Sequence, residues 1–113
     1  MIEAKGPFST AGRLLFLSVA LHLVVIAVSG GGYFVEMLAG AVIWAAIAYG
    51  LMRGMRWLAF IAFLLAMGGG IVAMGYGMGT FGLTSIAFLA ITAVDWLAAA
   101  LLFVALWRPA ETA

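Results

Sequence analysis

Two side chains with titratable groups, Asp95 and His22, lie in the middle of long apolar stretches of this 113-residue chain. Asp95 is the only acid in the apolar run 83–107, and His22 is the only histidine in the sequence. A charged side chain at the centre of a bilayer costs roughly 2.5–3.5 kcal/mol on insertion scales, so such a residue usually faces protein and has a partner. The sequence therefore predicts that Asp95 is buried against another helix, with His22 as its partner.

Other polar or hydrogen-bonding side chains accompany this pair. Ser18 precedes His22 by four residues and Thr92 precedes Asp95 by three, so each pair shares one face of a helix. Trp44 also falls at mid-span, and its buried indole N–H needs an acceptor, which Asp95 could supply. Measured along ideal helices from the flanking arginines, His22 and Asp95 differ in depth by roughly 6 Å, a difference that helix tilt can span.

Three interpretations of this polar set stay open, and the first is favoured. The side chains could form a hydrogen-bonded clasp that fixes the helices or binds the helix of a partner. They could form a proton or ion relay, because carboxyl and imidazole groups both carry and release protons. They could also form a pocket in which the pair and Trp44 recognise a small amphiphile or a cation.

The composition places the chain among integral membrane proteins. Hydrophobic residues make up 68% of the sequence and charged residues 8%, which a small soluble domain could not accommodate because much of its surface stays wet. The absence of cysteine excludes disulfides, thiolate metal sites and cysteine nucleophiles. The net charge of +1 gives no reason to expect nucleic acid as a partner.

Four apolar runs are long enough to cross a bilayer, at residues 11–29, 34–52, 57–78 and 83–107. Each has about 19 to 25 residues, and about 20 are needed for a hydrocarbon core of roughly 30 Å. The connections are short and contain glycine, so neighbouring helices must run antiparallel. Glu36 lies near the start of the second run, where a helix dipole favours a carboxylate. The predicted fold is a single all-α domain, an antiparallel bundle of four transmembrane helices.

The basic residues set the predicted orientation. With four spans, all five fall on one side of the membrane and none on the other. The positive-inside rule then places both termini and the middle connection in the cytoplasm, with the chain in a bacterial-type cytoplasmic (inner) membrane. The five residues are Lys5, Arg13, Arg53, Arg56 and Arg108.

The N-terminal segment has a second interpretation. Its basic residues, its apolar run and the small residues at 27–29 resemble a signal peptide with a cleavage site. The apolar run is long for a signal peptide, and the first transmembrane helix is the favoured interpretation.

Small residues recur four apart in the third run and at the end of the second. Lipid gives no hydrophobic drive for helix association, so small residues that allow close approach are typical of helix contacts. They predict close packing, within one chain or in a homodimer. A bend at the glycine triplet 68–70 is the alternative, because glycine is a weak helix former. The packing residues are Gly50, Gly54, Gly68, Gly69, Gly70, Ala73, Gly75 and Gly79.

No metal or cofactor is expected. Met67, Met74 and Met78 recur at helical spacing and thioethers suit Cu(I), but neither a cysteine nor a second histidine accompanies them. A haem held by two histidines would need a dimer, since His22 is alone. We interpret the methionines as apolar filler.

The sequence contains no catalytic motif. It has no phosphate-binding glycine loop followed by lysine, no His-Glu-x-x-His and no Gly-x-Ser-x-Gly. We therefore expect a non-enzymatic accessory protein that binds another membrane protein inside the bilayer, because no connection is long enough for a soluble binding domain. The alternative is a small transporter or a proton- or ion-coupled channel that uses Asp95 and His22. It would work as a homo-oligomer, since four helices rarely enclose a path.

Overall fold

The computed structural model describes residues 2–107, with side chains from residue 8 onward. Four helices form this part of the chain: α1 (Ile2–Val28), α2 (Phe34–Met52), α3 (Arg56–Met78) and α4 (Gly82–Trp107). The predicted all-α fold is confirmed, with no strand within residues 2–107. All four helices are long and apolar enough to cross a membrane, which indicates a multi-pass integral membrane protein.

The first helix is longer than its apolar run. It begins at Ile2, whereas the hydropathy pattern predicted a start at residue 11. An apolar run marks the part of a helix that crosses the hydrocarbon, and backbone hydrogen bonds can continue beyond it into a polar flank. The other three helices agree with the predicted runs to within one residue at each end.

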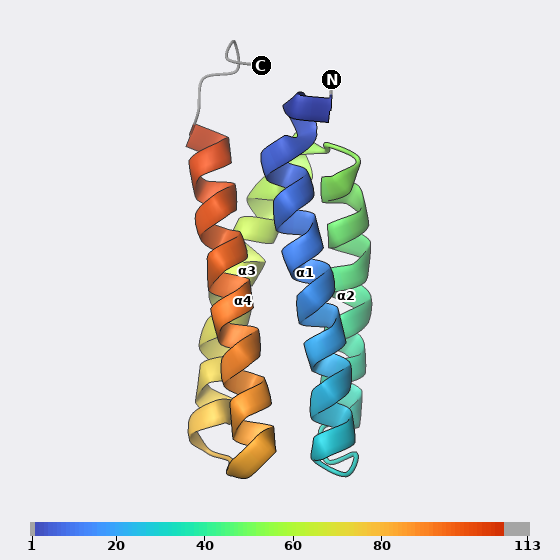
Figure 1. Ribbon diagram of the computed structural model, residues 1–113, viewed down its shortest axis with the longest axis vertical. Helices are drawn as coiled ribbons and strands as arrows, with labels where there is room; N and C mark the ends of the chain where they lie inside the picture. The colour runs from blue at the N-terminus through green and yellow to red at the C-terminus, as the bar shows by residue number, and fades with distance from the viewer. Residues whose placement is uncertain (1, 108–113) are drawn as a thin grey trace.

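The helices run alternately up and down, and one pair of neighbours is not packed together. α1 packs against α2 and α4, and α4 packs against α3, whereas α2 and α3 hardly contact each other. Figure 1 shows α2 and α3 side by side at the short turn that joins them and well separated at their other ends. The core is therefore covered by packed helices on three sides and is open between α2 and α3.

The tight turns depend on glycines with a left-handed backbone. Gly54, which follows α2, has φ of +81°. Its N–H donates to the Leu51 carbonyl (2.9 Å) and the Met55 N–H donates to the Gly50 carbonyl (3.2 Å), the Schellman arrangement that ends a helix. Gly30, with φ of +69°, ends α1 in the same way. Gly54 therefore has the role of a turn residue, rather than the helix-packing role predicted from its spacing.

We expect Gly54→Ala to lower the free energy of unfolding by about 1 kcal/mol, because a Cβ disfavours positive φ. Gly32→Ala is the matched control. Gly32 lies in the turn between α1 and α2 and has no positive φ, and a Cβ there would meet only the Ser29 carbonyl at 3.5 Å. Unfolding titrations in mixed micelles would measure both variants. Equal effects would contradict the role given to the backbone of Gly54.

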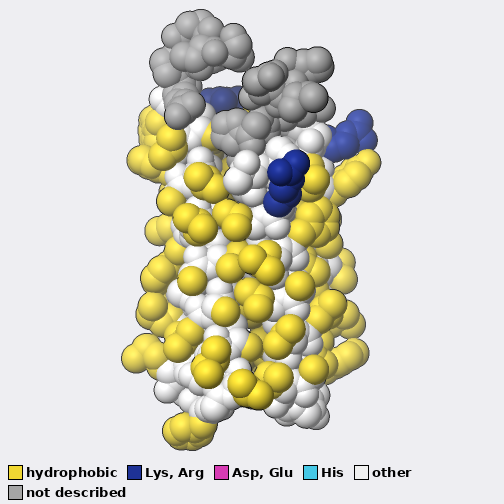
Figure 2. Space-filling view, in the orientation of Figure 1, with side chains coloured by type: hydrophobic (Ala, Val, Ile, Leu, Met, Phe, Trp, Pro, Cys, Tyr) yellow, Lys and Arg dark blue, Asp and Glu magenta, His cyan; other side chains and the backbone are white. Residues whose placement is uncertain are grey.

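The outer surface is apolar between the helix ends, and the arginines gather at one end (Figure 2). Arg13, Arg53 and Arg56 are exposed there. The Arg56 guanidinium also donates to the Leu106 carbonyl (2.8 Å), so it caps the C-terminal end of α4. Two of the five predicted topology-setting residues lie outside the described side chains, Lys5 and Arg108.

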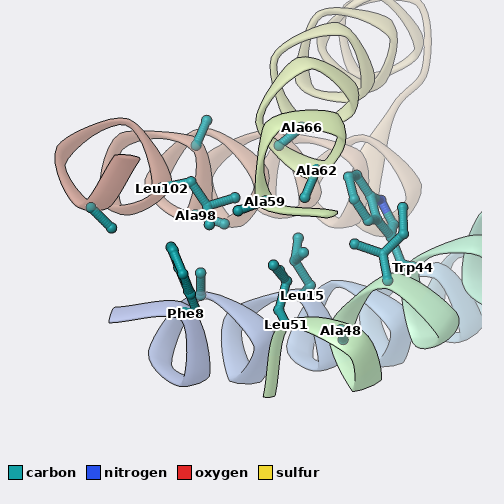
Figure 3. Packing of buried hydrophobic residues seen from close by; sticks show 14 residues of the cluster. Phe8, Leu15, Trp44, Ala48, Leu51, Ala59, Ala62, Ala66, Ala98 and Leu102 are labelled. Atoms are coloured by element: carbon teal, nitrogen blue, oxygen red, sulfur yellow. The ribbon is translucent and has the colours of Figure 1, made fainter. Parts of the chain in front are cut away.

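The core contains two apolar clusters. Figure 3 shows the larger, at the arginine end, where Leu15 of α1 and Leu51 of α2 face the alanines of α3 and α4. The smaller cluster lies toward the opposite end and includes Val25, Met37 and Phe88. On α1 and α4 the buried residues between the two clusters are polar.

The buried face of α3 consists only of alanine and glycine. These residues follow one another at spacings of three or four, so they form one stripe along the helix. Small side chains let α3 and α4 approach closely, which is the main way that helices associate in lipid. The stripe is Ala59, Ala62, Ala66, Gly70, Ala73 and Gly77.

α4 approaches α3 closely at Gly70, the last residue of the glycine triplet 68–70. A Cβ on Gly70 would collide with the indole of Trp96. The Thr92 hydroxyl donates to the Gly70 carbonyl (3.2 Å), and the Trp96 N–H donates to the Met67 carbonyl (3.3 Å). α3 is a continuous helix through the triplet, so the glycines do not break the helix, and Gly70 allows the close approach of α4.

Candidate functional site

Four polar side chains form one layer between the two apolar clusters. Ser18 and His22 come from successive turns of α1, and Thr92 and Asp95 from successive turns of α4. All four are buried, with between 0 and 7% of their surface exposed. These four residues of the predicted polar set therefore lie together, at a depth where each polar group needs a partner.

The direct link across this layer joins Ser18 to Asp95. The Ser18 hydroxyl donates to Asp95 Oδ1 at 2.7 Å. Both residues are at most 1% exposed. This bond connects α1 to α4 at the level of the membrane interior.

His22 does not bond to Asp95 among residues 8–107, so the predicted direct pair is not formed. The imidazole Nδ1–H donates to the backbone carbonyl of Ser18 at 2.6 Å, one turn earlier in α1. The ring is also packed against α2, since a Cβ on Gly40 would lie 2.8 Å from Nε2. The shorter serine side chain occupies the position facing Asp95, and His22 is turned toward α2.

The second oxygen of Asp95 has no hydrogen-bond partner within residues 8–107 and is buried. It faces the glycines of α3, because a Cβ on Gly69 would lie 3.3 Å from Oδ2. The same Cβ would lie 3.7 Å from Cζ2 of Trp44, so the indole is close by. No hydrogen bond from Trp44 to Asp95 forms in the described part of the chain. The predicted donor is therefore a neighbour of the carboxyl group and not its partner.

A cavity of about 470 Å³ lies between α2 and α3, where these helices are not packed together. We call it the α2–α3 crevice. His22 and Asp95 reach it from α1 and α4, and Trp44 and Gly69 line it from α2 and α3. Its size falls within the range of roughly 300–1,000 Å³ for small-molecule sites, and such sites are mostly apolar with a few polar groups.

The charges around the crevice are all of one sign. Among the described side chains there are two acids, Glu36 and Asp95, and both line it. Glu36 is exposed in the first turn of α2, away from the arginine end. None of the described lysine or arginine side chains lines the crevice. An acid at one end and an acid in the interior favour a positively charged occupant.

Apart from Gly54, the residues predicted to pack between helices fall into three groups. Gly50, Gly69 and Gly70 approach side chains of other helices or of the following turn. Gly68 and Gly75 have no atom within 4 Å of an added Cβ and face outward. The remaining two are Gly79, which ends α3, and Ala73, which is buried in the smaller cluster.

Several residues that contribute to the contacts between helices were not predicted from the sequence. The Ser85 hydroxyl donates to the Gly77 carbonyl at 2.7 Å, adding a bond between α4 and α3. Ser85, Thr92 and Trp96 are separated by seven and four residues, a spacing that puts them on one face and could have signalled this contact. The sequence gives no comparable signal for Gly40. The absence of a side chain there matters only because the His22 ring packs against it.

No group of three or more histidine, cysteine, aspartate or glutamate side chains lies close enough to hold a metal ion within the described residues. Comparisons of the chain with protein-family models, with curated proteins and with solved structures find no match. Function is therefore inferred from the geometry of the site.

Proposed function

We propose that the protein is a non-enzymatic binding protein of a bacterial-type cytoplasmic membrane, and that it binds an organic cation in the α2–α3 crevice as a small carrier. Both ends of the helical domain face the cytoplasm in this proposal, because the described arginines share one end. The observation that carries the proposal is Asp95 Oδ2, a buried carboxyl oxygen without a partner that borders an open cavity.

If Asp95 served only to hold the helices together, there would be no reason for its Oδ2 to lie beside a cavity without a hydrogen-bond partner. An unsatisfied buried polar atom costs about 1–3 kcal/mol, more for a charged group. Only Oδ1 of Asp95 is used in joining α1 to α4. Since Oδ2 borders a cavity with mostly apolar walls, a ligand with a cationic group and an apolar body would satisfy both the oxygen and the walls.

The same geometry supports a non-enzymatic role. Ser18, Asp95 and His22 are the residue types of a hydrolytic triad, but their bonds differ from it. In a triad the imidazole accepts the proton of the serine hydroxyl. Here the Ser18 hydroxyl donates to Asp95, and His22 bonds to the backbone carbonyl of Ser18. The imidazole is therefore not placed to take the proton of the hydroxyl.

Calorimetry in phosphatidylcholine nanodiscs tests the proposal with decylammonium as the cation and decanol as the uncharged analogue. We expect decylammonium to bind at least tenfold more tightly than decanol. We expect Asp95→Asn, which keeps the shape of the side chain, to remove most of that difference, because a hydrogen bond to a charged group contributes about 1.5–3 kcal/mol. Equal binding of the two compounds, unaffected by Asp95→Asn, would refute cation binding.

A role as an accessory subunit is the second candidate. Gly68 and Gly75 are seven residues apart on α3 and face outward with nothing packed on them. Small residues on a lipid-facing surface favour the close approach of another helix, from a membrane partner or a second copy. In this case Gly75→Leu, at the one of these two positions that does not line the crevice, would abolish co-purification of the partner after gentle detergent extraction while decylammonium binding persists. Unchanged co-purification would exclude this face as the contact.

A further inference from the structure

Two hydrogen-bond acceptors from different helices border the α2–α3 crevice. The first is Asp95 Oδ2, which has no partner within residues 8–107. The second is His22 Nε2. Because the Nδ1–H of this ring donates to the Ser18 carbonyl, Nε2 of the neutral imidazole carries a lone pair. The crevice thus offers acceptors on α1 and on α4.

We infer that the crevice selects a primary ammonium group carried on an apolar chain, an inference that rests on the cation-binding function proposed above. An R–NH₃⁺ group has three N–H donors, so it can bond to Asp95 Oδ2 and to His22 Nε2 at the same time. A trimethylammonium group has no N–H donor and would leave both acceptors without a bond. The apolar chain would lie along Ile43, Leu64 and Val72, which line the crevice and are exposed on the outer surface.

The aromatic residues of the crevice do not form a cage for a quaternary ammonium. Such cages present open ring faces to the cation. The rings of Tyr76 and Phe88 are stacked on each other, with centroids 5.1 Å apart and an interplanar angle of 19°. Tyr33 packs edge-on to Phe88 at 5.2 Å. These contacts occupy ring faces of Phe88 and Tyr76, so Trp44, the third aromatic residue among those described along the crevice, would have to meet a cation without a cage of several open rings.

Glycine on α3 keeps the carboxyl oxygen open to a ligand. A Cβ on Gly69 would lie 3.3 Å from Asp95 Oδ2, in the space that an ammonium nitrogen would occupy. A Cβ on Gly75, which lies on the same helix and does not line the crevice, would meet no atom within 4 Å. Gly69→Ala and Gly75→Ala are therefore a matched pair of variants with the same change in composition and helix propensity.

The experiment compares decylammonium with decyltrimethylammonium in phosphatidylcholine nanodiscs by calorimetry. We expect the primary ammonium to bind at least tenfold more tightly. His22→Asn keeps a donor for the Ser18 carbonyl but lacks an atom at the Nε2 position, and it should reduce this preference severalfold. Gly69→Ala should weaken decylammonium binding severalfold, and Gly75→Ala should leave it unchanged.

The outcomes separate this inference from the proposed function. If both cations bind equally and both depend on Asp95, cation binding stands and selection of a primary ammonium is overturned. If neither cation binds better than decanol, the proposed function itself fails. Nanodiscs that contain phosphatidylethanolamine distinguish the source of the group. Competition by this lipid would identify a lipid headgroup as the source, and the absence of competition would identify a free amine. Selection of the primary ammonium stands in both cases.

Discussion

Gly70→Val is expected to lower the free energy of unfolding by about 3 kcal/mol, the largest effect of any single substitution considered for this chain. The side chain would enter space that the Trp96 indole fills, because even a Cβ at position 70 collides with that ring. Either the indole swings out and loses its bond to the Met67 carbonyl, or α3 moves away from α4 and the Thr92 bond to the Gly70 carbonyl breaks. Each response removes a hydrogen bond between the two helices.

Gly68→Val is the matched control for this prediction. It lies in the same triplet and the same helix, but nothing is within 4 Å of its added Cβ. Only helix propensity then changes, by well under 1 kcal/mol. Unfolding in mixed micelles would give both values, and in a Trp96→Ala background the cost of Gly70→Val should fall by at least half. Equal costs for the two valine variants would show that the triplet does not pack as described.

The contrast between Gly68 and Gly70 also shows the limit of what the sequence could predict. Hydropathy and charge alone predicted four helices, with every end correct to within one residue except the start of α1, because burial in lipid requires long apolar runs. Small-residue spacing predicted that the third helix packs closely. Residues two apart lie about 200° apart around a helix, so only the position of α4 decides which glycine is in the contact. A full stripe that included Ala59, Ala62 and Ala66 would have identified the correct face.

The candidate site was predictable to a similar degree. Asp95, His22, Ser18 and Thr92 were expected near one another, and they do form one layer. The partner of Asp95 was expected to be His22 and is Ser18, because the choice depends on side-chain direction, which spacing along α1 does not give. The crevice had no sequence signal at all. It exists because α2 and α3 separate after their turn, and this depends on how all four helices pack.

The second large effect concerns the hydrogen bond from Ser18 to Asp95, which the structure has in place of the predicted His22–Asp95 pair. Ser18→Ala is expected to lower the free energy of unfolding by about 2 kcal/mol, because it leaves Asp95 buried with neither carboxyl oxygen bonded. Asp95→Ala leaves the Ser18 hydroxyl without its acceptor. The two changes remove the same bond, so together they should cost less than the sum of their separate costs. Coupling energies between such side chains in membranes average about 0.6 kcal/mol and reach about 1.7 kcal/mol.

A matched cycle with His22→Asn and Asp95→Ala distinguishes this bond from a His22–Asp95 pair. These two side chains share no hydrogen bond in the described residues, so their costs should add to within about 0.5 kcal/mol. Steric-trap measurements in bicelles would give the six free energies that the two cycles need. Strong coupling of Asp95 to His22 with none to Ser18 would mean that the imidazole faces Asp95 in the folded protein. In that case His22 Nε2 would no longer be free for a ligand, whereas Ser18–Asp95 coupling leaves both acceptors facing the crevice.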